Sequence, residues 1–192
     1  MADSTHKVLM RVAITLTVLW IGWSVYDGFL KDSSPHSQEY AAAFRFLEDG
    51  QYQDALKIYQ SLLKQNPDDT YALRGKAQAL LQLGDFDQAL AVYDEAVYRD
   101  PEMGVTYANR GILKDRMGDF EGALADYRKA IALEPEVADG PGFMTRFLRN
   151  QAEKPPTVAD RANYLEEQLA RPESQRLLQV PEMDKAQRSY KM

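Results

Sequence analysis

The sequence predicts an all-α protein in which three helical hairpins stack into a solenoid, preceded by one transmembrane helix. Two observations predict this fold. A stretch that begins GQYQDALKIY at Gly50 returns in similar form at Gly84 and at Gly118, on a constant period of 34 residues. Near the N-terminus, residues 12–30 form a mostly apolar run in which Asp27 is the only charged residue. A fixed period of this length is typical of repeats that stack on their neighbours. The apolar run is long enough to cross a bilayer.

The composition narrows the possible functions. The chain has 192 residues, a net charge of −6 and no cysteine. The excess of acid lies in residues 36–137, which hold 18 acidic and 11 basic residues. An acidic body disfavours nucleic-acid binding, because phosphate contacts need clustered Lys and Arg. The absence of cysteine excludes disulfides, thiolate catalysis and sulfur-ligated metals.

No set of residues in the sequence indicates an enzyme. Both histidines, His6 and His36, flank the apolar run, and no Ser or Thr is paired with a plausible histidine base. Acidic pairs such as Asp68 and Asp69 are sequence neighbours, so their side chains diverge on a helix or lie in a turn. We therefore expect a protein without catalytic residues, cofactors, metal ions or a small-molecule substrate.

Residues 1–11 form a short flank, and residues 12–30 are predicted to be an uncleaved transmembrane signal anchor. A helix of 19 residues is roughly 28 Å long, which is close to the hydrocarbon thickness of a bilayer. Trp20 and Trp23 suit the boundary between membrane and water. A cleaved signal peptide and a buried core helix are the alternatives. The first needs a small-x-small cleavage site, of which the sequence offers only a weak pair.

The basic residues around the apolar run indicate its orientation. Lys7 and Arg11 precede the run, whereas Lys31 alone follows it closely. The positive-inside rule then places the N-terminus in the cytoplasm and the rest of the chain on the non-cytoplasmic, periplasmic side. We interpret residues 31–35, which are polar and end in Pro35, as a linker.

The repeats follow a helical spacing. After each glycine an aromatic residue follows at two positions, an alanine three later, a tyrosine four after that, and Leu or Ala three further on. The spacings of 3, 4 and 3 place these side chains on one face of a helix. A second helical stretch precedes each glycine, so each repeat is predicted to be a hairpin of two helices. Small side chains allow the helices to approach closely, and a proline closes each unit.

This pattern resembles the tetratricopeptide repeat family, whose units are helical hairpins of 34 residues. The resemblance covers three units: 36–69, 70–103 and 104–137. The second half of the family pattern is met in every unit by Tyr52, Ala55, Tyr59 and Pro67, then Phe86, Ala89, Tyr93 and Pro101, then Phe120, Ala123, Tyr127 and Pro135. The first half is looser, since its tryptophan position holds Glu39, Leu73 and Tyr107, and its glycine position holds Ala43, Ala77 and Gly111.

The last hairpin of such an array exposes an apolar face that another element must cover. We expect residues 138–154 to supply a capping helix, formed by Gly142 to Lys154. Residues 155–192 are predicted to be a helical C-terminal extension with a tail. Thr157 is the expected N-cap of its first helix, with Asp160 completing a capping box. A short helix is expected near Pro172.

The resemblance also implies a binding groove, because in this family the first helix of each hairpin lines a concave surface that takes a partner peptide. The residues expected to face this groove, or to add to its wall, are Tyr40, Phe44, Leu47, Tyr71, Arg74, Gln78, Leu81, Gln82, Val105, Asn109, Ile112, Asp115, Arg116, Arg146 and Arg149. An asparagine at the place of Asn109 commonly bonds the backbone of a bound peptide in this family. The family's clamp for acidic C-termini is not expected, because Tyr40, Phe44 and Gly75 hold its positions.

Two functions fit these features. The first is a membrane-anchored protein–protein interaction module that acts as a scaffold or assembly factor for a membrane or envelope complex. The second is a permanent accessory subunit of a larger membrane enzyme, docked through its C-terminal extension. The partner in either case is a protein or peptide segment of the complex.

Overall fold

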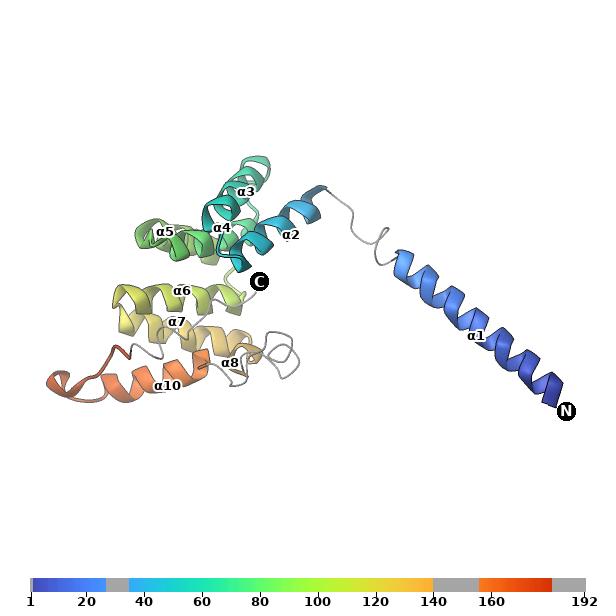
Figure 1. Cartoon of the computed structure of the whole chain (residues 1–192). Coiled ribbons are helices and arrows are strands. Elements are labelled where there is room, and N and C mark those ends of the chain that lie inside the picture. Colours follow the sequence, from blue (N-terminus) through green and yellow to red (C-terminus); the bar gives the residue numbers. More distant parts are fainter. Residues whose placement is uncertain (1, 27–34, 140–155, 181–192) are drawn as a thin grey trace. The chain divides into compact units, whose positions relative to one another are not determined.

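The computed structural model describes residues 2–26, 35–139 and 156–180 (Figure 1). The chain divides into two compact units, residues 1–41 and residues 42–192. Each unit is described by itself below.

The first unit contains the apolar helix α1 (Ala2–Val25). Its apolar side chains are exposed, including Trp20 at 69% and Trp23 at 68%. The helix begins earlier than residue 12, so Lys7 and Arg11 lie within it. The segment of residues 6–24 is long and apolar enough to cross a membrane. A signal sequence near the N-terminus has the same property.

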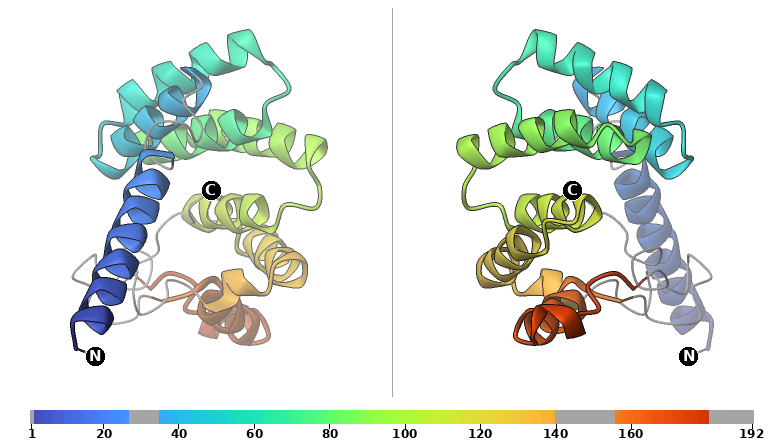
Figure 2. Two further views of the ribbon diagram at one scale, coloured as in Figure 1. Left: turned by 90° about the vertical axis from the view of Figure 1, so that its right-hand side faces the viewer. Right: turned by 90° about the vertical axis from the view of Figure 1, so that its left-hand side faces the viewer.

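Six helices of 14 residues each make up the predicted hairpins. They are α2 (Pro35–Glu48), α3 (Tyr52–Gln65), α4 (Thr70–Leu83), α5 (Phe86–Arg99), α6 (Gly104–Met117) and α7 (Phe120–Leu133). From α3 onward, each helix contacts the next one in the chain, so the hairpins stack in order (Figure 2). The predicted all-α hairpin array with an N-terminal apolar helix is thereby confirmed.

The repeated glycines form the turns inside the hairpins. Gly50, Gly84 and Gly118 have φ angles of 75°, 82° and 85°. Residues other than glycine are strained in this left-handed conformation. It ends a helix because the backbone amides of the turn can then donate hydrogen bonds to the last carbonyl groups of the helix. Asp85 and Asp119 then cap the next helix, each accepting a hydrogen bond from a backbone amide three residues on. The short sequence GD thus ends one helix and begins the next.

The small and aromatic residues of the repeat fill the core. Every alanine and tyrosine of the second-helix pattern is 0% exposed: Ala55, Tyr59, Ala89, Tyr93, Ala123 and Tyr127. The first helices supply matching gaps. A β-carbon at Gly75 would lie 2.2 Å from the Tyr59 ring, and one at Gly111 would lie 2.6 Å from the Tyr127 ring. Burial raises the pKa of Tyr59 and of Tyr93 far above the ordinary tyrosine value.

The end of the array is covered by the C-terminal part of the chain. After α8 (Glu136–Asp139), the chain forms α10 (Val158–Leu169) and the short 3-10 helix η2 (Glu173–Gln175). α10 packs against α7 and contributes Val158, Ala162 and Leu165 to the hydrophobic core. The predicted capping helix at 142–154 lies outside the described residues. Among the described elements, α10 covers the last hairpin.

The start of α10 confirms the predicted capping box. The Thr157 hydroxyl oxygen accepts a hydrogen bond from the Asp160 amide at 3.1 Å, and the Asp160 carboxylate accepts one from the Thr157 amide at 2.9 Å. The short helix expected near Pro172 is η2, which follows that proline.

Candidate peptide-binding face

The structure divides the expected groove residues into three groups by burial. Tyr40 and Phe44 of α2, Tyr71 and Gln78 of α4, and Val105 of α6 are half-buried, and Arg116 at the end of α6 is exposed. The buried ones are Leu47, Arg74, Asn109 and Ile112. Arg146 lies outside the described residues. Tyr40 belongs to the first compact unit. All the other groove residues named in this paragraph that the structure describes belong to the second unit.

The residues with exposed surface on α4 and α6 share a face within each helix. Tyr71 and Gln78 are seven positions apart, close to two helical turns, and Val105 and Arg116 are eleven apart, close to three turns. α4 and α6 contact each other directly. We call the surface formed by Tyr71, Gln78, Val105 and Arg116 the first-helix face. It combines aromatic, aliphatic, amide and cationic side chains.

The buried residues serve the array itself. Ile112 is 0% exposed and belongs to the hydrophobic core, so it packs against the neighbouring helices instead of facing a partner. Asn109 is also 0% exposed, and the residue already takes part in an interaction within the chain. Direct contact between Asn109 and a bound peptide therefore needs a rearrangement of its surroundings.

Arg74 is a buried cation beside the first-helix face. Its guanidinium lies 5.8 Å from the centre of the Tyr71 ring, and its Nη1 lies 3.8 Å from the Asp100 carboxylate. Burial lowers the pKa of Arg74, and the negative charge of Asp100 opposes that shift. Nε and Nη1 have no hydrogen-bond acceptor among the described residues. Two donors of this side chain thus lack the partners that buried polar groups normally have.

A second group of charges on α5, α6 and α7 is structural. Arg110 donates to both carboxylate oxygens of Asp126, at 2.8 and 2.7 Å, and to Asp94 at 2.7 Å. Burial lowers the pKa of Arg110, but the hydrogen bond and charge of Asp126 outweigh it and leave the pKa raised. Lys114 lies 2.9 Å from the same Asp126 carboxylate. These pairs join three successive helices and leave few of their polar atoms for a partner.

The end of α6 meets α10 through a buried ion pair. Arg161 of α10 donates to both oxygens of Asp115 at 2.7 Å, and the Tyr127 hydroxyl donates to the same carboxylate at 3.1 Å. Arg161 is 1% exposed. Asp115 was expected to face the groove, whereas Arg161 was not singled out. The sequence could have indicated Arg161, because this charged residue lies among the apolar residues Val158, Ala162 and Leu165. A charge in such surroundings needs a buried partner.

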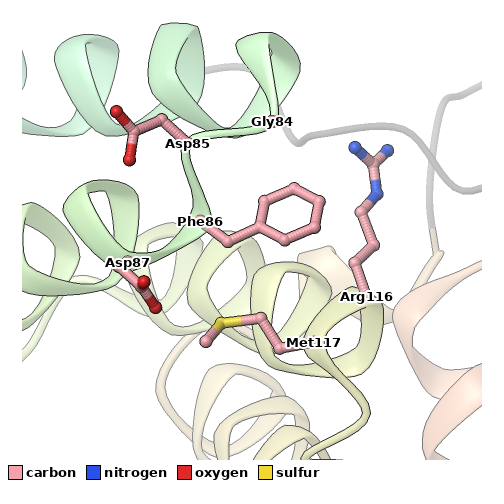
Figure 3. Close-up of a pocket in the computed structure, with 6 residues that line it drawn as sticks. All are labelled: Gly84, Asp85, Phe86, Asp87, Arg116 and Met117. Atoms are coloured by element: carbon pink, nitrogen blue, oxygen red, sulfur yellow. The ribbon is translucent and has the colours of Figure 1, made fainter.

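A shallow pocket of about 450 Å³ lies beside the exposed end of this face (Figure 3). It is lined by the α4–α5 turn, by Phe86 and by Arg116 and Met117 at the end of α6. Figure 3 shows the Phe86 ring between that turn and the Arg116 side chain. The described residues contain no cluster of His, Cys, Asp and Glu that could hold a metal ion. The pocket therefore offers contact surface, with an aromatic ring and a cation as its main features.

Comparison with known proteins agrees with this architecture. Tetratricopeptide repeat models match residues 46–103 and 105–137, and no enzyme family matches. No curated protein matches the chain in sequence.

Solved structures share the fold. The chain is similar to the first tetratricopeptide repeat domain of Spaghetti (RPAP3) bound to the HSP90 peptide SRMEEVD, with a TM-score of 0.56 and 19% identity over 73% of this chain and 97% of that one. It is similar to the Yersinia enterocolitica type III secretion translocator chaperone SycD, with a TM-score of 0.56 and 19% identity over 75% and 93% of the two chains. It is also similar to PcrH in complex with the chaperone binding region of PopD, with a TM-score of 0.53 and 23% identity over 68% of this chain and 90% of that one.

Sequence identities this low show only that the fold is shared. They do not transfer the binding partners of those proteins to this chain. The two matched segments together run from the end of α2 through α7, so they cover most of the stacked hairpins. The chain is a tetratricopeptide repeat protein with an apolar helix at its N-terminus.

Proposed function

We propose that the chain is a membrane-anchored interaction module that binds a peptide segment of a partner protein on its first-helix face. In this role it acts as a scaffold or assembly factor for a membrane or envelope protein complex. The helix α1 is the anchor, and the repeats lie on the non-cytoplasmic side.

The observation that carries this proposal is the composition of the first-helix face. Tyr71, Gln78 and Val105 are partly accessible while the core beneath them is closed. Interaction surfaces favour aromatic and cationic side chains around such a core. Beside them, the guanidinium of Arg74 lies 5.8 Å from the centre of the Tyr71 ring, so a buried cation supports the aromatic side chain of this face. Two of the similar structures, those of RPAP3 and PcrH, hold a segment of another protein.

The anchor part of the proposal is supported by α1. Its apolar side chains have no partners to bury them within the described residues, as the 0% burial of residues 6–24 indicates. An exposed apolar surface of this size needs a membrane or another protein to cover it. The basic residues Lys7 and Arg11 at its beginning favour a cytoplasmic N-terminus.

The proposal is tested by capturing the full chain from solubilised membranes and measuring the proteins that come with it by quantitative mass spectrometry. The test variant carries Tyr71→Ala and Gln78→Ala together, which removes two partly accessible side chains of the first-helix face. Truncating one of the few central residues that carry most of the binding energy of an interface costs about 2 kcal/mol or more, which is about thirtyfold in affinity. We expect the partner to be lost from this variant.

The matched control is Tyr98→Ala. Tyr98 is 88% exposed on α5, outside the first-helix face, so its replacement removes a tyrosine ring of equal size. We expect this control to retain the partner. Equal recovery of the partner by the control and by the double variant would exclude the first-helix face as the binding site.

The alternative of a permanent enzyme subunit docked through the C-terminal extension predicts a constant ratio to the partner through purification. In the structure, much of that extension is already engaged, because α10 packs on α7. This observation favours the first-helix face as the docking surface.

A further inference from the structure

The chain turns back after α10 and lays an extended segment beside it (Figure 1). We call residues 176–180 the return segment. Arg176, Leu178 and Val180 are half-buried, whereas Leu177 and Gln179 between them are exposed. Alternating burial with a period of two is the pattern of an extended peptide that rests on a surface with one side.

Three side chains of α10 hold the backbone of the return segment. Arg161 Nη2 donates to the carbonyl oxygen of Leu178 at 2.9 Å. The Tyr164 hydroxyl donates to the carbonyl oxygen of Leu177 at 2.6 Å, and the Leu177 amide donates to Gln168 Oε1 at 2.9 Å. Spacings of three and four place Arg161, Tyr164 and Gln168 on one helix face. These bonds reach main-chain groups, which any extended peptide offers.

The apolar side of the return segment adds a side-chain preference. Leu178 packs against the hydrophobic core, and the segment lines a shallow pocket of about 430 Å³ together with Phe120. One repeat earlier, the equivalent Phe86 lines a pocket with Arg116 and Met117 at the end of the next first helix. The return segment thus lies beside Phe120 as the end of α6 lies beside Phe86.

The polar groups under the return segment are built to receive a peptide. Arg161 is 1% exposed and Gln168 is 4% exposed, and each bonds the segment. If the segment left, Arg161 would keep Asp115 but lose an acceptor, and the Gln168 oxygen would lose a donor. Buried polar groups need such partners. A second extended peptide supplies the same carbonyl and amide groups.

We propose that Arg161, Tyr164, Gln168 and Phe120 form a binding site for an extended peptide with a leucine-like side chain at the place of Leu178, and that the return segment is its intramolecular occupant. The tethered segment closes the site, and a partner segment of the same kind enters when the return segment leaves. This site is distinct from the first-helix face, and the inference does not rest on the function proposed above.

The test uses the full chain in detergent micelles and a fluorescent peptide, SQRLLQV, which copies residues 174–180. Leu178→Asp places a charge on the packed side of the return segment and should release it. Leu177→Asp makes the same change on the exposed side and is the matched control, since Leu177 is 66% exposed. A tethered occupant acts at an effective concentration of about millimolar, so it should suppress probe binding by about tenfold or more.

We expect the peptide to bind the Leu178→Asp chain at least about tenfold more tightly than the wild type or the Leu177→Asp control. Adding Gln168→Ala to the Leu178→Asp chain should weaken that binding again. If a folded Leu178→Asp chain fails to bind the peptide, the segment is a fixed cap and the proposal is overturned.

Hydrogen exchange of the wild-type chain gives an independent result that needs no folded variant. The Leu177 amide should exchange faster than the amides in the middle of α10, because the return segment opens without the helix unfolding. If both exchange at the rate of global unfolding, the segment does not leave the site and the proposal fails.

Discussion

At the scale of single residues, the most consequential contact is the buried pair of Arg161 and Asp115. Both side chains are almost fully covered, at 1% and 4% exposure. Two charges taken out of water are stable only while their geometry and extra hydrogen bonds compensate for the lost hydration. Here the pair is bidentate and the Tyr127 hydroxyl adds a third bond. Loss of either charge strands the other.

Asp115→Ala should therefore lower the free energy of unfolding by about 3–5 kcal/mol. Asp94→Ala is the matched control, because Asp94 also pairs with an arginine but its side chain is 55% exposed. That change should cost about 1 kcal/mol or less. Urea denaturation of both variants, followed by circular dichroism, measures the difference. Similar losses in the two variants would show that the Arg161 pair is not shielded from solvent.

The same pair shows why the contacts of the candidate site could not be predicted from the sequence. Asp115 and Arg161 are 46 positions apart, and a contact between distant positions leaves no local pattern. Ile112 and Asn109 were placed in the groove because the family resemblance assigns the first helix of each hairpin to it. Spacing fixes the face of a helix on which a residue lies, but the neighbouring hairpins decide whether that face is covered.

At the scale of elements, the hairpins could be predicted because each helix carries its own markers. Gly84 and Asp85 end one helix and begin the next through local backbone chemistry, and Ala89 and Tyr93 mark the buried side. The same reasoning predicted the N-terminus of α10 from Thr157. It did not predict that α10 would pack on α7, since no repeat pattern continues into that segment.

The α10 cap offers a prediction at this scale. Thr157→Val keeps the shape of the side chain but removes the hydroxyl that accepts from the Asp160 amide, and should cost about 1 kcal/mol of stability. Thr157→Ser keeps the hydroxyl and should retain most of the stability. Thermal unfolding monitored by circular dichroism compares the two. If the serine variant were as unstable as the valine variant, the hydroxyl would not account for the loss of stability.

At the scale of the whole molecule, the two compact units have opposite surfaces. The repeats enclose their apolar side chains, whereas α1 exposes a continuous apolar surface with Trp20 and Trp23. A chain of this kind cannot keep both units in water without covering α1. In the proposed role, attachment to a membrane would cover α1 and would confine the proposed binding surfaces of the repeats to a layer beside the bilayer. Such confinement would raise the effective concentration of the repeats toward other membrane proteins.

This arrangement predicts that the full chain stays in the membrane pellet after washing with alkaline carbonate, with its N-terminus intact. The physical reason is that a helix of about 19 apolar residues spans roughly 28 Å, the thickness of the hydrocarbon layer. Immunoblotting of pellet and supernatant, with mass spectrometry of the N-terminal peptide, measures both properties. A chain lacking residues 2–30 is the control and should appear in the supernatant. Recovery of a soluble product that begins between residues 24 and 40 would identify α1 as a cleaved signal sequence. The repeats would then act free of the membrane, and the proposed role beside the bilayer would have to be abandoned while the binding surfaces remained.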